Sequence, residues 1–159
     1  MNTTSIKITS EKLNLQECYD FVADPSCGGI AVFVGTVRNA TQNKEVTQLD
    51  FSTYKPMAIK EMQKIADAAL EKFGVTKIAI HHAEGLLTIG DVPVIITVSS
   101  PHRKAAFEAC QYAIDTLKET VPIWKRSHFK QSKTNVVSKT FSLPLFERIV
   151  LIRGISSVG

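Results

Sequence analysis

The 159-residue sequence lacks the features that mark membrane and secreted proteins. No apolar run reaches about 18 residues, the length that a membrane-spanning helix needs. The first ten residues alternate between polar and apolar side chains and contain no apolar core of a signal peptide. We therefore expect a cytoplasmic protein with no membrane partner.

Cysteine is scarce, and its spacing matches no redox or zinc motif. Cys18, Cys27 and Cys110 form no C-x-x-C pair, and an odd number of cysteines does not complete a set of intramolecular disulfides. This usage is typical of a reducing compartment. Each cysteine is expected to be a small buried apolar group.

Motifs for metals, nucleotides and common hydrolases are also missing. The four histidines, His81, His82, His102 and His128, show no metal-ligand spacing. There is no G-x-G-x-x-G, Walker A or G-x-S-x-G sequence. The sequence thus predicts neither a metal site nor a bound cofactor.

The charge that is present is mildly basic, with a formal net value of +4, and this favours anionic ligands. The basic residues of interest bracket one predicted helix, and the aromatic residues do not alternate with them. Nucleic-acid binding uses many phosphate contacts over an extended surface. We therefore expect a small anionic ligand rather than a nucleic acid.

The hydrophobic pattern predicts a single α+β domain with a mixed or antiparallel sheet and helices packed on it. The apolar runs at 29–34 and 92–98 indicate buried strands, and 46–53 is predicted to return from 29–34 as a long hairpin. Pro56 and Gly74 are typical of the first residue and the C-terminal cap of a helix. The remaining expected elements are strands at 5–9 and 77–82 and helices at 13–22 and 101–119.

The start of the last predicted helix is unusually basic. Ser100 is expected as its N-cap and Pro101 as its first residue, which places His102, Arg103 and Lys104 in the first turn. A helix N-terminus carries partial positive charge and disfavours cations. A bound anion would reverse this penalty, because free N–H groups and basic side chains would then act on it together. The alternative is a solvated basic turn, and the sequence leaves both open.

Further cations lie near the end of the same helix and after an earlier strand. Lys118 lies four residues after Ile114 and therefore flanks the apolar stripe. Such a lysine can project from the rim of a pocket and act as a base or nucleophile, or it can cover apolar surface with its stem. Lys125 follows closely, and Arg38 comes after an apolar strand, a suitable place for contact with phosphate or carboxylate.

Four segments of the chain resemble the large subunit of molybdopterin synthase, the MoaE family. They are residues 28–39 (GGIAVFVGTVRN), 53–58 (TYKPMA), 98–109 (VSSPHRKAAFEA) and 112–126 (YAIDTLKETVPIWKR). The resemblance covers about 28–126 of one domain spanning 1–159, and the tail at 130–159 diverges from the family. Residues 146–153 (FERIVLIR) in this tail are predicted to form an edge strand of the sheet or a dimer contact.

The resemblance implies an α/β-hammerhead fold and a catalytic subunit that forms a homodimer. A small ubiquitin-like partner, similar to MoaD, would bind at each outer end and complete a heterotetramer. The partner's C-terminal Gly-Gly, carried as a thiocarboxylate, would enter a pocket of the large subunit. Its sulfur would pass to cyclic pyranopterin monophosphate (precursor Z), and two transfers would build the molybdopterin dithiolene in molybdenum cofactor biosynthesis.

The resemblance also implies roles for individual residues. By position, Lys118 corresponds to the main catalytic lysine and Lys125 to a second essential lysine. The substrate-binding positions of the family correspond here to Arg38, His102, Arg103 and Phe33. Two alternatives remain open: a non-catalytic homologue that binds the partner, and a phosphate-binding α+β module unrelated to the molybdenum cofactor.

Overall fold

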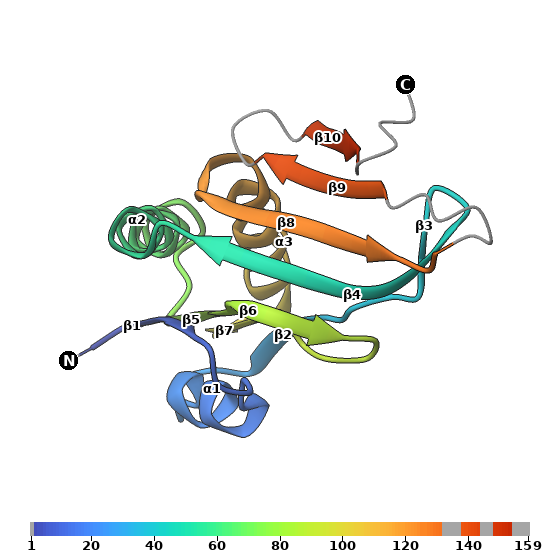
Figure 1. Cartoon of the computed structure of the whole chain (residues 1–159). Helices are drawn as coiled ribbons and strands as arrows, with labels where there is room; N and C mark the ends of the chain where they lie inside the picture. The colour runs from blue at the N-terminus through green and yellow to red at the C-terminus, as the bar shows by residue number, and fades with distance from the viewer. Residues whose placement is uncertain (1, 132–137, 144–147, 154–159) are drawn as a thin grey trace.

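Two β-sheets and three helices make up the part of the chain that the computed structural model describes, residues 2–131, 138–143 and 148–153 (Figure 1). The helices are α1 (Leu15–Val22), α2 (Lys55–Phe73) and α3 (Arg103–Thr120). The α+β architecture predicted from the sequence is confirmed.

The first sheet has four strands in the order β1-β5-β7-β2. Strands β1 and β5 run parallel, and the other pairs are antiparallel, so the sheet is mixed as predicted. Helix α1 packs on one face of this sheet, and α2 and α3 pack on the other (Figure 1). The strands are β1 (Thr4–Thr9), β2 (Gly29–Gly35), β5 (Lys77–Ala83) and β7 (Val94–Ser100).

The second sheet has the order β10-β9-β8-β4-β3, with β6 also paired to β4. All of its pairs are antiparallel. The main core lies between the two sheets and helices α2 and α3. The strands are β3 (Ala40–Thr41), β4 (Lys44–Thr53), β6 (Gly85–Thr88), β8 (Ile123–Phe129), β9 (Ser138–Leu143) and β10 (Arg148–Arg153).

Helix α2 confirms the prediction from local sequence signals. Pro56 lies in its first turn, where the missing N–H group breaks no hydrogen bond. Gly74 adopts a left-handed conformation with φ 65° and caps the C-terminus, donating its N–H to the carbonyl of Leu70 at 3.0 Å. Met62, Ile65 and neighbouring alanines on one face are buried in the core.

The predicted hairpin between 29–34 and 46–53 is wrong. Strand β2 pairs along its whole length with β7, while β4 pairs with β8 and β6 in the other sheet. The only hairpin that β4 forms with the preceding segment is the short one with β3, closed by Gln42 and Asn43 at positive φ. The two segments are close in sequence, but each forms a longer hydrogen-bonded ladder with a strand that is distant in the sequence.

Strand β2 is also less buried than predicted. It is an edge strand of the four-stranded sheet, and alternate side chains point out of it, leaving Val32 45% and Val34 36% exposed. By contrast, every residue of β7 is buried, as the apolar run predicted. The exposed apolar side chains of β2 are a surface that an interaction with another chain would cover.

The start of the last helix differs from the prediction as well. Ser100 pairs with Gly29 at the end of β7, so α3 begins at Arg103, and His102 is an N-cap without a side-chain hydrogen bond. Pro101 precedes the helix, and its carbonyl accepts from the N–H of Gly28 at 3.3 Å. The sheet ladder therefore holds Ser100 away from the helix.

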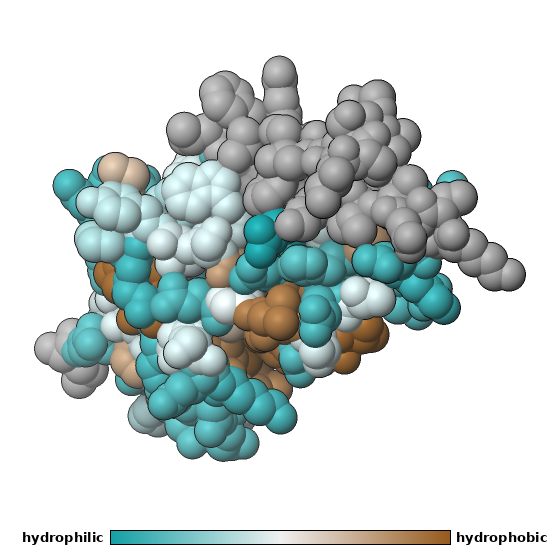
Figure 2. All heavy atoms as spheres, viewed as in Figure 1, coloured by the Kyte–Doolittle hydropathy of each residue, from teal (hydrophilic) through white to brown (hydrophobic). Residues whose placement is uncertain are grey.

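The divergent tail contributes to the second sheet. Strand β10 pairs antiparallel with β9 and forms the edge of this sheet, which confirms the predicted edge strand for residues 148–153. Residues 146–147 lie outside the described residues. The face in Figure 2 is mostly hydrophilic, and its apolar side chains gather near β6, where Leu86 is 56% exposed.

Candidate active site

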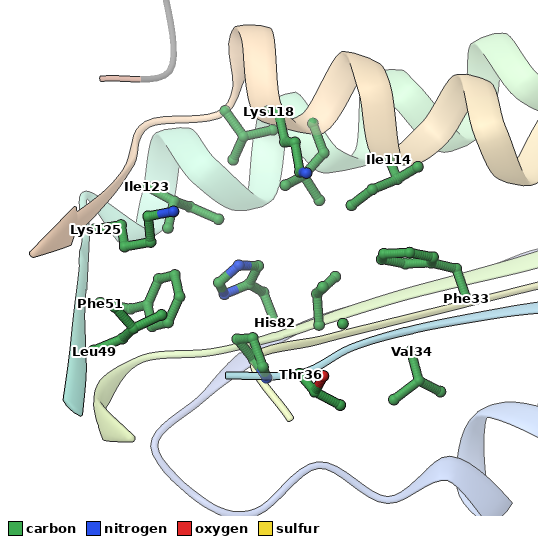
Figure 3. A pocket seen from close by; sticks show the side chains of 15 residues that line it. Phe33, Val34, Thr36, Leu49, Phe51, His82, Ile114, Lys118, Ile123 and Lys125 are labelled. Carbon is green, nitrogen blue, oxygen red and sulfur yellow. The ribbon is translucent and has the colours of Figure 1, made fainter. Parts of the chain in front are cut away.

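A pocket of about 600 Å³ lies between the two sheets, at the C-terminal end of α3 (Figure 3). Its walls come from β2, β4, β5, β7, α3 and β8 and from short segments beside them. The residues that line it are Phe33, Val34, Gly35, Thr36, Leu49, Phe51, His82, Pro93, Val94, Ile114, Leu117, Lys118, Val121, Ile123 and Lys125.

The two lysines singled out in the sequence meet in this pocket. Lys118 lies in the last turn of α3, where Val121 caps the helix by donating to the carbonyl of Leu117. The chain then reverses at Pro122 into β8, whose inward-facing residues include Ile123 and Lys125. Both ammonium groups face the same space in Figure 3. The reversal brings together two cations that lie seven residues apart.

Lys125 is an electrostatically unfavourable cation. Burial lowers its pKa, and the positive charges of Lys118 and Arg38 lower it further. None of these three residues has an acidic partner among the ion pairs of the described residues. A partly buried cation that lies near two exposed ones, with no counter-charge among those ion pairs, is stabilised by a bound anion.

The Lys125 amine should titrate below the value of about 10.4 that is usual for lysine. The native state therefore releases this proton at lower pH than the unfolded state. Between the lowered pKa of the native state and the ordinary pKa of the unfolded state, this group makes the free energy of unfolding rise with pH. Replacing Lys118 with Met should raise the Lys125 midpoint, since one cause of the shift is removed. Side-chain ¹⁵N NMR over a pH series measures the Lys125 midpoint in the wild type and in the variant.

The control for this titration is Lys64→Met. Lys64 lies on helix α2, its ammonium group is exposed and 2.9 Å from the Glu61 carboxylate, and it is not among the pocket residues. This variant should leave the Lys125 midpoint where it is. A midpoint that is equally unmoved in Lys118→Met would contradict the electrostatic coupling of the two pocket lysines.

The opposite wall of the pocket is apolar. Phe33 lies close to Ile114 in Figure 3, as expected for the predicted pocket residue, and Leu49 and Phe51 of β4 line the far side. Arg38 is exposed just after β2, near enough to influence Lys125 but outside the lining. The pocket therefore suits a ligand with a flat apolar part and an anionic group.

His102 and Arg103 do not reach this pocket within one copy of the chain. Fifteen residues of α3 separate Arg103 from Lys118, which is roughly 22 Å at 1.5 Å per residue. Arg103 lies instead beside Gly29, where a Cβ atom would come within 3.3 Å of the Arg103 Cα. The two residues thus lie at one end of β2, and the pocket lies at the other.

His82 is a pocket residue that the sequence analysis missed. It is 4% exposed, and its ring packs edge-on to Phe51 with centroids 5.3 Å apart. Its neighbour His81 points to the opposite face, where its ring contacts Ser5 and Cys18. The alternation of side chains along a strand was the available signal, because it places two adjacent histidines in separate environments.

The structure also bears on metals and thiols. In the described part of the chain, no group of three or more His, Cys, Asp or Glu side chains is arranged to hold a metal ion. Cys18 and Cys110 are buried as predicted, and burial raises the pKa of each thiol to about 11. Cys27 is only half-buried. Of the helices described, none is long and apolar enough to cross a membrane.

The sequence from residue 8 to residue 120 matches the protein family described as MoaE protein. The chain belongs to the MoaE family. The molybdopterin synthase catalytic subunit of Homo sapiens is 45% identical over 129 residues, covering 81% of this chain and 69% of that protein. That of Dictyostelium discoideum is 42% identical and covers 82% and 84%, respectively. The family expected from the sequence motifs is confirmed.

Solved MoaE-family structures have the same fold. Molybdopterin synthase from Staphylococcus aureus superposes with a TM-score of 0.75 at 38% identity, covering 83% of this chain and 95% of that one. A complex of subunits 1 and 2 of the molybdopterin-converting factor from Helicobacter pylori gives a TM-score of 0.63 at 25% identity. It covers 79% of this chain and 84% of that one. The expected hammerhead-type fold is therefore confirmed.

Proposed function

We propose that this chain is the catalytic subunit of a molybdopterin synthase. It transfers sulfur from the thiocarboxylated C-terminus of a small ubiquitin-like subunit to cyclic pyranopterin monophosphate. The observation that carries this proposal is the convergence of Lys118 and Lys125 on one half-apolar pocket in a MoaE-family chain. The names of the relatives and the two-subunit complex from Helicobacter pylori support it.

The pocket chemistry fits both anionic reactants. A volume of about 600 Å³ accommodates a small fused-ring ligand. Phe33 and Ile114 would pack against the pterin, while Lys118, Lys125 and Arg38 would attract its cyclic phosphate and the thiocarboxylate. Each cation without an acidic partner becomes more stable when an anion is bound, so binding energy is concentrated at the reacting groups.

The transfer proceeds in two steps per sulfur. The thiocarboxylate sulfur attacks an electrophilic carbon of the substrate: a carbon–sulfur bond forms, a carbon–oxygen bond of the same carbon breaks, and its oxygen leaves as water or stays on the phosphate. Substrate and partner are then linked as a thioester. Water then attacks the acyl carbon, the acyl–sulfur bond breaks, and the partner leaves as a carboxylate. Lys118 assists the attack as a base or by stabilising negative charge, and Lys125 orients the tail or the substrate. No cysteine is among the residues that line this pocket in the part of the chain described.

A homodimer would bring His102 and Arg103 to the site. These residues lie at the Gly29 end of the edge strand β2, and the pocket lies at its Gly35 end. Two copies that place β2 strands side by side about a twofold axis run them antiparallel, so each Gly29 end meets the other copy's pocket. Val32, Val34 and Phe107, which is 64% exposed, would be covered. With one small subunit per copy, the assembly is a heterotetramer in the cytoplasm.

The direct test combines the purified chain with precursor Z and a thiocarboxylated small subunit. We expect molybdopterin to form, detected as its fluorescent oxidation product. Binding of the small subunit without any product would instead indicate the non-catalytic homologue. Tight binding of simple phosphates with no response to the Gly-Gly tail would favour the phosphate-binding module.

A further inference from the structure

The two adjacent histidines of β5 use their ring nitrogens differently. His81 has a neighbour at both nitrogens: Ser5 Oγ lies 2.8 Å from Nε2, and Cys18 Sγ lies 3.2 Å from Nδ1. His82, on the opposite face of the strand, is held through Nδ1 alone, 2.7 Å from the carbonyl oxygen of Ala83. Its Nε2 has no hydrogen-bond partner among the residues that the structure describes. His82 is the one that lines the pocket.

The contact with Ala83 determines which nitrogen of His82 carries the proton. A carbonyl oxygen can only accept, so Nδ1 is the donor and Nε2 keeps its lone pair. Burial lowers the pKa of His82 to about 4, so the ring remains neutral at physiological pH. The edge-on contact with Phe51 and the short bond to Ala83 together fix the orientation of the ring.

This lone pair differs chemically from the other polar groups of the pocket. The ammonium groups of Lys118 and Lys125 can only donate while they are charged. Thr36 also lines the pocket and offers a hydroxyl group, but its side chain is exposed. Figure 3 shows the His82 ring in the middle of the lining, with Phe51 and Lys125 to one side and Lys118 above. A buried neutral acceptor thus lies beside a cluster of cations.

We propose that His82 Nε2 accepts a hydrogen bond from an N–H group of the bound pterin and so sets the orientation of the ring. This inference rests on the function proposed above. It makes His82 the residue that recognises a hydrogen-bond donor on the ligand. The cations hold the anionic end, and the imidazole recognises the ring end. A ligand that fills the pocket without a donor at this position would leave the buried acceptor unpaired and bind less well.

A matched pair of variants, His82→Leu and His82→Gln, isolates the acceptor. Both lose the aromatic ring and the native donor to Ala83, but Gln offers a carbonyl oxygen near the position of Nε2. We expect Kd for precursor Z, measured by calorimetry, to rise about tenfold in His82→Leu and less than about threefold in His82→Gln. Inorganic phosphate, used as a second probe of the cations alone, should bind all three proteins equally.

The wild-type protein provides an independent readout that needs no variant. In ¹⁵N NMR of histidine-labelled protein, the Nε2 resonance of a neutral ring with its proton on Nδ1 moves upfield when this nitrogen accepts a hydrogen bond. We expect that movement for His82 on addition of precursor Z, and none on addition of phosphate. His81, which lies on the other face of β5, is the internal control.

The outcomes separate this inference from the function on which it rests. Unchanged binding of precursor Z in His82→Leu, or an unmoved Nε2 resonance at saturating ligand, would overturn the role of His82 and leave the proposed function standing. Equal weakening of phosphate and precursor Z would assign His82 to pocket shape and also overturn it. Failure of the wild-type chain to bind precursor Z at all would refute the proposed function and this inference together.

Discussion

Replacing Lys118 with alanine should lower the rate of molybdopterin formation by about two to three orders of magnitude, the scale of losing a preorganised charge in a partly desolvated site. The fold should persist, because Lys118 is an exposed helical residue with no acidic partner among the described ion pairs, and alanine favours a helix. The measurement is single-turnover product formation with precursor Z and thiocarboxylated partner.

The matched control for this variant is Lys64→Ala. Lys64 carries the same charge on the exposed side of helix α2, pairs with Glu61 and is not among the pocket residues, so its removal should leave the rate within about twofold. Thermal unfolding should be alike for both variants and the wild type. Full turnover by Lys118→Ala would show that this lysine is not part of the catalytic machinery.

Mixed dimers should recover activity from two inactive parents. If Arg103 of one copy serves the pocket of the other, the Arg103→Ala dimer loses a charged contact in both pockets, a cost of at least about 30-fold. A hybrid of Arg103→Ala and Lys118→Ala chains puts both defects in one pocket and leaves the other intact. After unfolding and random reassociation, half of the dimers are hybrids, so activity should return to about a quarter of the wild-type value.

A second mixture tests whether this recovery has the proposed origin. Lys118 and Lys125 line the same pocket of the same chain, so a hybrid of Lys118→Ala and Lys125→Ala has one defect in each pocket. This mixture should remain as inactive as its parents. Recovery there, or no recovery in the Arg103 mixture, would refute the shared site. An Arg103→Ala dimer with normal turnover would remove Arg103 from the site altogether.

Several elements of the fold follow from short-range signals. The limits of α2 come from Pro56, Gly74 and the helical spacing of its apolar residues, all of which act within a few residues. The continuous apolar run of β7 identified a strand buried on both faces. Helical spacing puts Lys118 beside Ile114, and in the structure both residues line the pocket, which agrees with the first of the two interpretations that the sequence left open.

Strand β8 shows where such signals end. Ile123–Phe129 mixes Trp124, two basic residues and a histidine, and nothing in it marks a strand until β4 supplies a ladder on one side and β9 on the other. The inward direction of Lys125 depends on that pairing. The direction of His82 also depends on tertiary packing. Helix α1 covers one face of the sheet, and the pocket that His82 lines is on the other face.

Local signals in the sequence therefore indicated the helices and the buried strand β7, because each rests on chemistry within about one turn or one strand. The family and the two pocket lysines came from the resemblance of four segments to MoaE proteins. The tertiary structure alone decided that β2 pairs with β7 rather than with β4, that Arg103 lies a helix length from Lys118, and that His82 faces the ligand pocket. These outcomes depend on competition between distant strands for the same hydrogen-bonding edges. That competition is a property of the whole packed chain.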